Sequence, residues 1–208
     1  DSDGNPTVSK EKVTEWVNNW AKENDLYSDD DLFVTYDGVL VHLENGTDTG
    51  WSFDLDGTVQ NIFTAISNKE NGVVKPAVKR KDTGTLLSEE TYVEISIPDQ
   101  RMVCYDKGIL KVDTPIVTGA INNNLSYSTY TPSNGIWHIT FKKKNHHMRG
   151  PLQSDGTYEY ETDVDYWMPF NGDIGIHDMT ERGAFGGDIY INNGSHGCIN
   201  TPYDAAKQ

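Results

Sequence analysis

The sequence predicts an α+β protein with a small N-terminal α+β domain over residues 1–90 and a mainly β domain over residues 91–208. Apolar residues recur at helical spacing in two segments before residue 68, whereas from residue 92 the apolar runs are short and separated by turn residues. The chain of 208 residues is also long for one core, because single domains usually hold roughly 100 to 200 residues. A polar segment over residues 79–85 marks the expected boundary.

The elements expected in the first domain are two helices, a hairpin and a returning strand. The first helix covers residues 8–23, where four apolar side chains lie three or four positions apart: Val13, Trp16, Val17 and Trp20. Two strand-like runs over residues 32–43 flank Asp37-Gly38, a dipeptide that favours a tight hairpin turn. A second helix runs through residues 59–66, and residues 73–79 return as a strand.

The second domain is expected to consist of strands, because its apolar runs are rich in β-branched and aromatic residues. The expected strands are YVEISI (92–97), RMVCYD (101–106), ILKVDTPIVTG (109–119), GIWHITFK (135–142), DIGIHD (173–178) and DIYIN (188–192). At the C-terminus, Thr201 and Pro202 form a helix start, which predicts a helix that continues past Gln208 in a longer protein.

Composition and charge exclude several classes of function. The chain has 17 Lys and Arg against 32 Asp and Glu, which gives a formal net charge of −15. Nucleic acids and anionic membranes are bound by clustered Lys and Arg, so neither is an expected partner. No apolar run approaches the roughly 18 residues of a membrane-spanning helix, and an aromatic content of 11% is typical of a folded domain.

The two cysteines differ in their surroundings. Two are too few for a disulfide scaffold, although one bridge between them is possible. Cys104 lies between Val103 and Tyr105 in an apolar strand, and it is expected to be a buried core residue. Cys198 lies in a polar, glycine-rich segment, which favours a catalytic role.

A histidine near the C-terminus has the chemistry to activate Cys198. The nucleophile is the thiolate, and an unperturbed thiol is only slightly ionised at neutral pH, so a catalytic cysteine needs a base. His177, at the end of an apolar strand, is the candidate base, since its ordinary pKa lies near neutrality. Gly197 lets the backbone turn, so that the amides of Gly197 and Cys198 are candidates to stabilise an oxyanion.

The residues from His177 onward resemble the motif of the L,D-transpeptidases, the YkuD-type cysteine enzymes of bacterial peptidoglycan. His177 is followed by seventeen residues and then by Ser195-His196-Gly197-Cys198-Ile199-Asn200. Further segments that resemble the family are residues 115–119, 131–137 and 166–172. The likeness covers residues 91–208 and implies a YkuD-like β-sandwich, while residues 1–90 are similar to the peptidoglycan-binding domain that often precedes it.

The resemblance implies a role for each motif residue. Cys198 is the nucleophile and His177 is the general base and then acid, with its second ring nitrogen held by the backbone carbonyl of Asp178. His196 and Gly197 shape the oxyanion pocket. Ser195 and Asn200 orient the loop. The residues implied to line the donor groove are Met148, Tyr160, Trp167, Phe170, Asn171 and Gly172.

The implied reaction is attack on the carbonyl before D-Ala of a tetrapeptide stem, which releases D-Ala and leaves a thioester on Cys198. An amine of a second stem then forms a 3→3 cross-link, whereas water gives an L,D-carboxypeptidase. The resemblance also implies acylation by carbapenems, no cofactor or metal, a monomer, and a place outside the cytoplasm in the bacterial cell wall, with an anchor before Asp1. Because the family domain continues through a helix and a strand, a truncated C-terminus is expected.

Three other readings remain open. A zinc hydrolase would use His146, His147, His177, His196 and Asp178, although no short helical His-Glu-x-x-His pair occurs. A wall-binding module with an inactive site would rely on residues 1–90. A papain-like protease is less consistent with the chain, because there the cysteine precedes the histidine.

Overall fold

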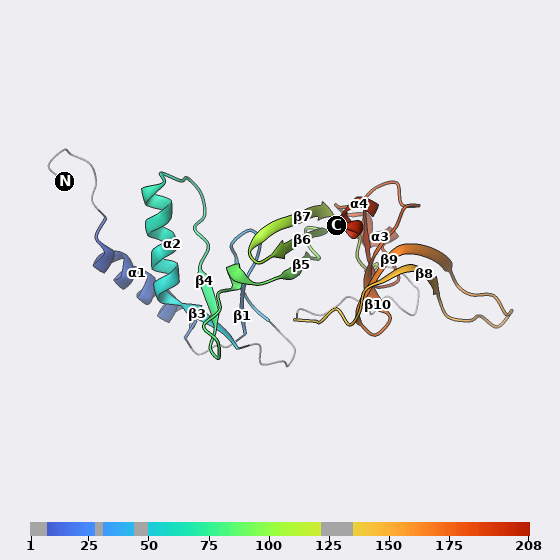
Figure 1. Ribbon diagram of the computed structural model, residues 1–208, viewed down its shortest axis with the longest axis horizontal. Helices are drawn as coiled ribbons and strands as arrows, with labels where there is room; N and C mark the ends of the chain where they lie inside the picture. The colour runs from blue at the N-terminus through green and yellow to red at the C-terminus, as the bar shows by residue number, and fades with distance from the viewer. Residues whose placement is uncertain (1–7, 28–30, 44–49, 122–134) are drawn as a thin grey trace. The chain divides into compact units, whose positions relative to one another are not determined.

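The computed structural model describes residues 8–27, 31–43, 50–121 and 135–208. The chain divides into two compact units (Figure 1): Asp1–Thr91 with Asp106–Gly108, and Tyr92–Tyr105 with Ile109–Gln208. Residues 131–134, part of the segment 131–137 that resembles the family, lie outside the described residues. Each unit has the class expected for it, namely a small helical unit followed by a sheet-rich one.

The described residues of the first unit form two α-helices, a 3₁₀ helix and two short antiparallel strand pairs, of which the first is a hairpin and the second has a helix between its strands. Its elements are α1 (Lys10–Glu23), β1 (Leu32–Val34), β2 (Leu40–His42), β3 (Trp51–Asp54), α2 (Leu55–Ser67), β4 (Ala77–Arg80) and the 3₁₀ helix η1 (Leu87–Glu89). The Ser9 hydroxyl accepts a hydrogen bond from the Lys12 amide and caps α1. The two helices contact each other, and β1 contacts both β3 and β4.

Two details of this unit correct the sequence prediction. The type I′ turn that Asp-Gly favours needs a positive φ at both central residues, but of Asp37 and Gly38 in the β1–β2 hairpin only Gly38 has one (+89°). The loop is therefore longer, and the Thr35 amide donates to the Val39 carbonyl at 2.9 Å. The polar segment over residues 79–85, expected to mark the domain boundary, begins inside β4, where Lys79 and Arg80 pair with β3.

The second unit is a β-sandwich. The three-stranded sheet has the order β5-β6-β7, and the four-stranded sheet has the order β11-β10-β9-β8. The strands are β5 (Tyr92–Ser96), β6 (Arg101–Asp106), β7 (Ile109–Pro115), β8 (Lys143–Arg149), β9 (Glu161–Asn171), β10 (Ile174–Asp178) and β11 (Ile199–Thr201). One apolar core cluster joins the sheets, with Met102 and Val112 from the first and Ile176 and Ile199 from the second.

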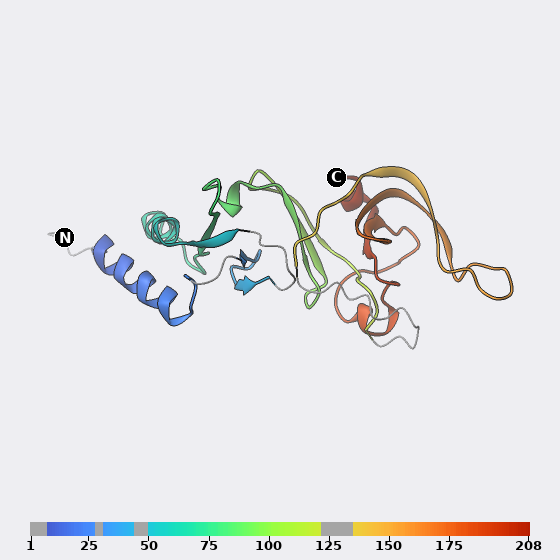
Figure 2. The same cartoon turned by 90° about the horizontal axis from the view of Figure 1, so that it is seen from below.

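Two expected strands of this unit are wrong. Residues 188–192 belong to a short helix, α3 (Ile189–Asn193), and residues 135–142 contain no strand among the described residues. The strand is instead the polar run that follows, β8, which pairs with β9 over Lys143–Arg149 in a long hairpin (Figure 2). β8 is the last strand of its sheet, and most of its side chains are polar and exposed. Charged side chains on an edge strand commonly prevent pairing with another chain.

The register of β10 and β11 places the motif residues on one face of the sheet. The two strands are parallel, with Ile176 opposite Ile199 and His177 opposite Asn200. Cys198, just before β11, packs against the apolar cluster that contains Trp167, and the Trp167 ring lies 5.9 Å from the His177 ring, so Cys198 and His177 lie on the same side of the sheet. Ile176 and Ile199 point the other way, into the sandwich core.

The chain ends in α4 (Tyr203–Lys207), which begins after Pro202 rather than at it. None of the helices in the described part of the chain is long and apolar enough to cross a membrane.

Candidate active site

His177 is held in one orientation inside the sheet. Its side chain is 1% exposed, and its Nδ1 atom lies 2.8 Å from the backbone oxygen of Asp178. A carbonyl oxygen only accepts, so Nδ1 carries the proton and the lone pair of the neutral ring is on Nε2. Burial lowers the pKa of His177 below the ordinary histidine value. The ring is therefore a neutral base at neutral pH.

Cys198 lies just before β11 and is a partly buried free thiol. Its Sγ atom donates to the Asp173 carbonyl at 3.5 Å. Burial raises the pKa of this thiol to about 11, while the Gly175 amide lowers it and the nearby Asp173 carboxylate raises it further. The resting pair is therefore a neutral thiol and a neutral imidazole, so proton transfer must accompany the attack.

The loop before Cys198 is closed by one serine. Ser195 Oγ accepts a hydrogen bond from the Gly197 amide at 3.0 Å and donates to the Cys198 carbonyl. Gly197 has a φ of +125°, which side-chain-bearing residues rarely adopt. The Gly197 amide, expected to face an oxyanion, is bonded to Ser195 instead. The Gly175 amide, which faces the sulfur, was not anticipated from the sequence.

The structure gives Asn200, which the resemblance assigns to orienting the loop, two side-chain partners. Its 2% exposed side chain lies between His177 and Arg182. In the amide orientation that satisfies both neighbours, Nδ2 donates to His177 Nε2 at 3.1 Å, and Oδ1 accepts from Arg182 Nε and Nη2 at 3.2 Å each. The chain thus has a hydrogen-bonded series from Arg182 through Asn200 to His177.

Three predicted substrate residues lie beside Cys198, and His196 joins them. Met148 and Trp167 form a small apolar cluster with Val164, and both Tyr160 and Cys198 pack against it. The exposed His196 ring stacks on Tyr160 with 4.8 Å between centroids. Trp167 also lies 5.9 Å from the His177 ring. These apolar and aromatic side chains therefore form one surface next to the thiol.

The other predicted substrate residues are placed differently. Phe170 packs against the sandwich core on the opposite face of the sheet from His177. Asn171 ends β9, and Gly172, with a φ of +57°, forms the turn before Asp173, whose carbonyl contacts the thiol. The turn after β9 thus contacts the Cys198 thiol through the Asp173 backbone carbonyl. Phe170 packs in the sandwich core and does not line the surface beside the thiol.

The remaining predicted residues have partners of their own. The Asp178 carboxylate accepts from the Tyr166 amide at 2.7 Å. His146 stacks on Trp167, and His147 Nδ1 lies 2.7 Å from Asp163. Within the described ranges, no three His, Cys, Asp or Glu side chains are grouped closely enough to hold a metal ion. The two cysteines pack on opposite faces of the sheet, because Cys104 contacts the sandwich core and Cys198 contacts the Trp167 cluster.

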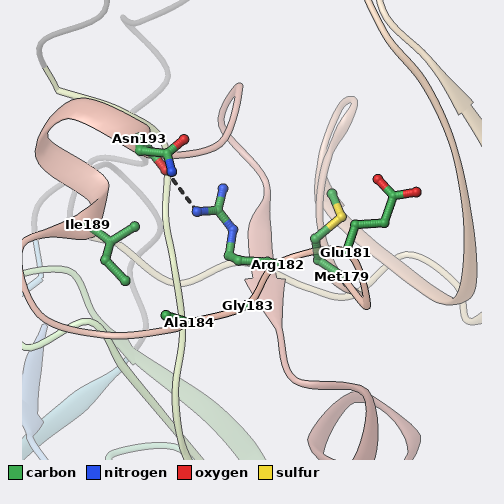
Figure 3. A pocket seen from close by; sticks show the side chains of 7 residues that line it. All are labelled: Met179, Glu181, Arg182, Gly183, Ala184, Ile189 and Asn193. Atoms are coloured by element: carbon green, nitrogen blue, oxygen red, sulfur yellow. Dashed lines mark hydrogen bonds between the residues drawn. The ribbon is translucent and has the colours of Figure 1, made fainter.

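A cavity of about 510 Å³ lies next to Arg182. Its walls are formed by Met179, Glu181, Arg182, Gly183, Ala184, Ile189 and Asn193 (Figure 3). The guanidinium points across it, and Nη1 donates to the Asn193 backbone oxygen at 2.9 Å. Sequence reasoning missed Arg182, although one signal was available: it is the only Lys or Arg between Arg149 and Lys207.

The fold and the site agree with one protein family. The YkuD family, described as the L,D-transpeptidase catalytic domain, matches residues 90–208, more than half of the chain. This chain belongs to the YkuD family of L,D-transpeptidase catalytic domains. No curated protein matches the chain significantly.

Solved structures of L,D-transpeptidases are similar to this chain. The Ldtfm-avibactam carbamoyl enzyme is 29% identical, with a TM-score of 0.56, over 99% of this chain and 77% of that one. A cysteine-to-serine mutant of the Enterococcus faecium L,D-transpeptidase is 28% identical, with a TM-score of 0.56, over 99% of this chain and 79% of that one. The Enterococcus faecium catalytic domain acylated by ertapenem is 38% identical, with a TM-score of 0.47, over 57% of this chain and 86% of that one.

Proposed function

We propose that this protein is a peptidoglycan L,D-transpeptidase that works through a thioester on Cys198. The placement of His177 carries the proposal. Its Nδ1 proton is fixed on the Asp178 carbonyl, so the lone pair that can accept a proton is on Nε2. Its ring lies beside Trp167, and Cys198 packs against the same Trp167 cluster.

The reaction has two steps. His177 Nε2 exchanges its hydrogen bond from Asn200 for the thiol proton as Sγ attacks the carbonyl that precedes D-Ala of a tetrapeptide stem. The tetrahedral intermediate collapses, the carbon–nitrogen bond breaks, and the imidazolium returns the proton to the leaving D-Ala amine. An amine of a second stem then attacks the thioester, forms the 3→3 amide and releases the thiolate, which recovers a proton. Water in place of the amine gives a carboxypeptidase.

The apolar surface beside the thiol suits a peptide donor. The Trp167 cluster and the Tyr160–His196 stack adjoin Cys198, and aromatic side chains commonly line such sites. The resemblance also supports acylation of Cys198 by carbapenems, and the similar Ldtfm forms a covalent carbamoyl enzyme with avibactam. We propose further that the protein acts outside the cytoplasm at the cell wall as a monomer, and that residues 1–90 bind peptidoglycan.

Incubation of the protein with a disaccharide tetrapeptide, followed by intact-mass analysis, tests this function. We expect an adduct with the mass of the stem without its terminal D-Ala, and no adduct with Cys198→Ala, because that variant lacks the sulfur. Cys104→Ala is the matched control and should keep the adduct, since Cys104 packs in the sandwich core. An unchanged mass of the wild-type protein at every pH and time would contradict the proposal.

A second measurement separates transfer from hydrolysis. Chromatography of the products formed with an excess of acceptor stem should show the cross-linked dimer from transpeptidation, or a free tripeptide from carboxypeptidase activity. Binding to cell-wall sacculi without either product would instead favour the inactive wall-binding module.

A further inference from the structure

The direction of each hydrogen bond between Arg182 and His177 is fixed by the groups at the two ends. The Asp178 carbonyl only accepts, so the neutral His177 ring has its proton on Nδ1 and its lone pair on Nε2. A guanidinium only donates, so the Asn200 oxygen must face Arg182. The Asn200 NH₂ group is left facing His177 Nε2, at 3.1 Å.

We propose that Arg182 is a positioning residue that holds the Asn200 amide with its NH₂ group toward His177 Nε2 and so keeps the ring neutral in the resting protein, before the thiol proton is transferred. The proposal rests on the proposed function, in which His177 is the base. A protonated ring would direct an N–H group at the amide hydrogens of Asn200. Turning the amide would relieve this contact, but it would direct the same hydrogens at the guanidinium of Arg182.

Arg182 is well placed to resist that turn. Its Nε and Nη2 atoms both bind the Asn200 oxygen, as a fork that lysine cannot reproduce. Its Nη1 atom is fixed on the Asn193 carbonyl at 2.9 Å (Figure 3). All three nitrogens of the guanidinium thus have a partner, and the plane of the group is set by two different parts of the chain.

The charged groups around His177 work in opposite directions. Asp178, on the same strand, raises the pKa of His177 through its backbone hydrogen bond and its charge, whereas burial and the Arg182 charge lower it. The Cys198 thiol lies just before the neighbouring strand β11, and β9 contributes Trp167, which has no charge. Because a less basic imidazole gives up its proton more readily, the arrangement favours return of the proton to the leaving amine.

Titration of His177 by NMR, with ¹⁵N-labelled histidine and no substrate, tests the inference. Arg182→Met removes both charge and donors, and we expect the His177 pKa to rise by about one pH unit. Arg182→Gln removes the same charge but keeps an amide donor for the Asn200 oxygen, so its His177 pKa should lie between those of Arg182→Met and the wild type. Equal values in the two variants would show that only charge acts, and would overturn the inference.

Two further measurements complete the test. If Arg182→Met does not fold, Asn200→Ala takes its place; it should also raise the His177 pKa, and no rise would overturn the inference. The pH profile of acylation by a carbapenem should move with the titration, with roughly tenfold slower acylation of Arg182→Met on the acid limb. If no form of the protein is acylated, the proposed function fails, while the substrate-free titration still decides the role of Arg182.

Discussion

Replacing His177 with glutamine is expected to slow acylation of Cys198 at neutral pH by about a thousandfold, a typical contribution of general base catalysis. The thiol cannot ionise unaided at this pH, because burial raises its pKa to about 11. In the wild type, His177 accepts the proton during the attack. The rate should be measured by mass spectrometry, as the appearance of the carbapenem adduct.

The pH dependence makes this prediction specific. The wild-type base is active when neutral, so its rate should fall only as the pH drops through the His177 pKa, which burial places below the ordinary value of about 6.5. In His177→Gln the rate should follow the thiolate and rise about tenfold per pH unit up to about 11, the raised pKa of Cys198. A flat profile with wild-type rates would show that another group is the base.

Replacing Gly194 with alanine is expected to destabilise the second unit by about 3 kcal/mol, at the upper end of the usual cost of overpacking. A Cβ atom there would lie 2.4 Å from the Ala120 nitrogen and 2.5 Å from its Cα atom. Both are backbone atoms, so no side-chain rotation relieves the contact. Thermal unfolding followed by circular dichroism should show a Tm lower by roughly 10 °C.

The same substitution should also slow acylation, because Gly194 precedes the loop that carries the nucleophile. Ser195 is hydrogen-bonded on both sides to this segment: its amide donates to the Thr118 carbonyl at 2.9 Å, and its carbonyl accepts from the Ala120 amide at 3.0 Å. Gly183→Ala is the matched control for stability, since nothing lies within 4 Å of its added Cβ atom. If the two variants melt at the same temperature, the close approach at Gly194 does not limit stability.

The fold class could be read from the sequence, but particular elements could not. The alternation of apolar residues in GIWHITFK has the period of a strand, yet strand pairing begins only at Lys143. The paired residues include adjacent lysines and histidines because an edge strand with exposed side chains needs no apolar face. In the same way, the β-branched residues of Ile189–Asn193 favoured a strand, but this short segment is a single helical turn.

The site was predictable as far as a local motif describes it. The resemblance named the Asp178 carbonyl as the partner of His177 Nδ1, and this hydrogen bond is present. It did not predict that the Gly175 amide contacts Cys198 or that the Arg182 guanidinium contacts Asn200. Strand pairing and loop conformation bring these groups together, and residue spacing in the sequence does not describe either one. Phe170 is aromatic, as groove-lining residues often are, but its position along β9 directs its side chain into the sandwich core.

The hydrogen bond from the Cys198 thiol to the Asp173 carbonyl has a consequence for the chemical durability of the protein. Oxidants and alkylating agents react with thiolates, and a thiol with a pKa of about 11 is almost wholly protonated at neutral pH. The unliganded protein should therefore resist peroxide and iodoacetamide much better than cysteine enzymes that store a thiolate–imidazolium pair. Reactivity is confined to the moment when an acyl donor meets both the sulfur and His177.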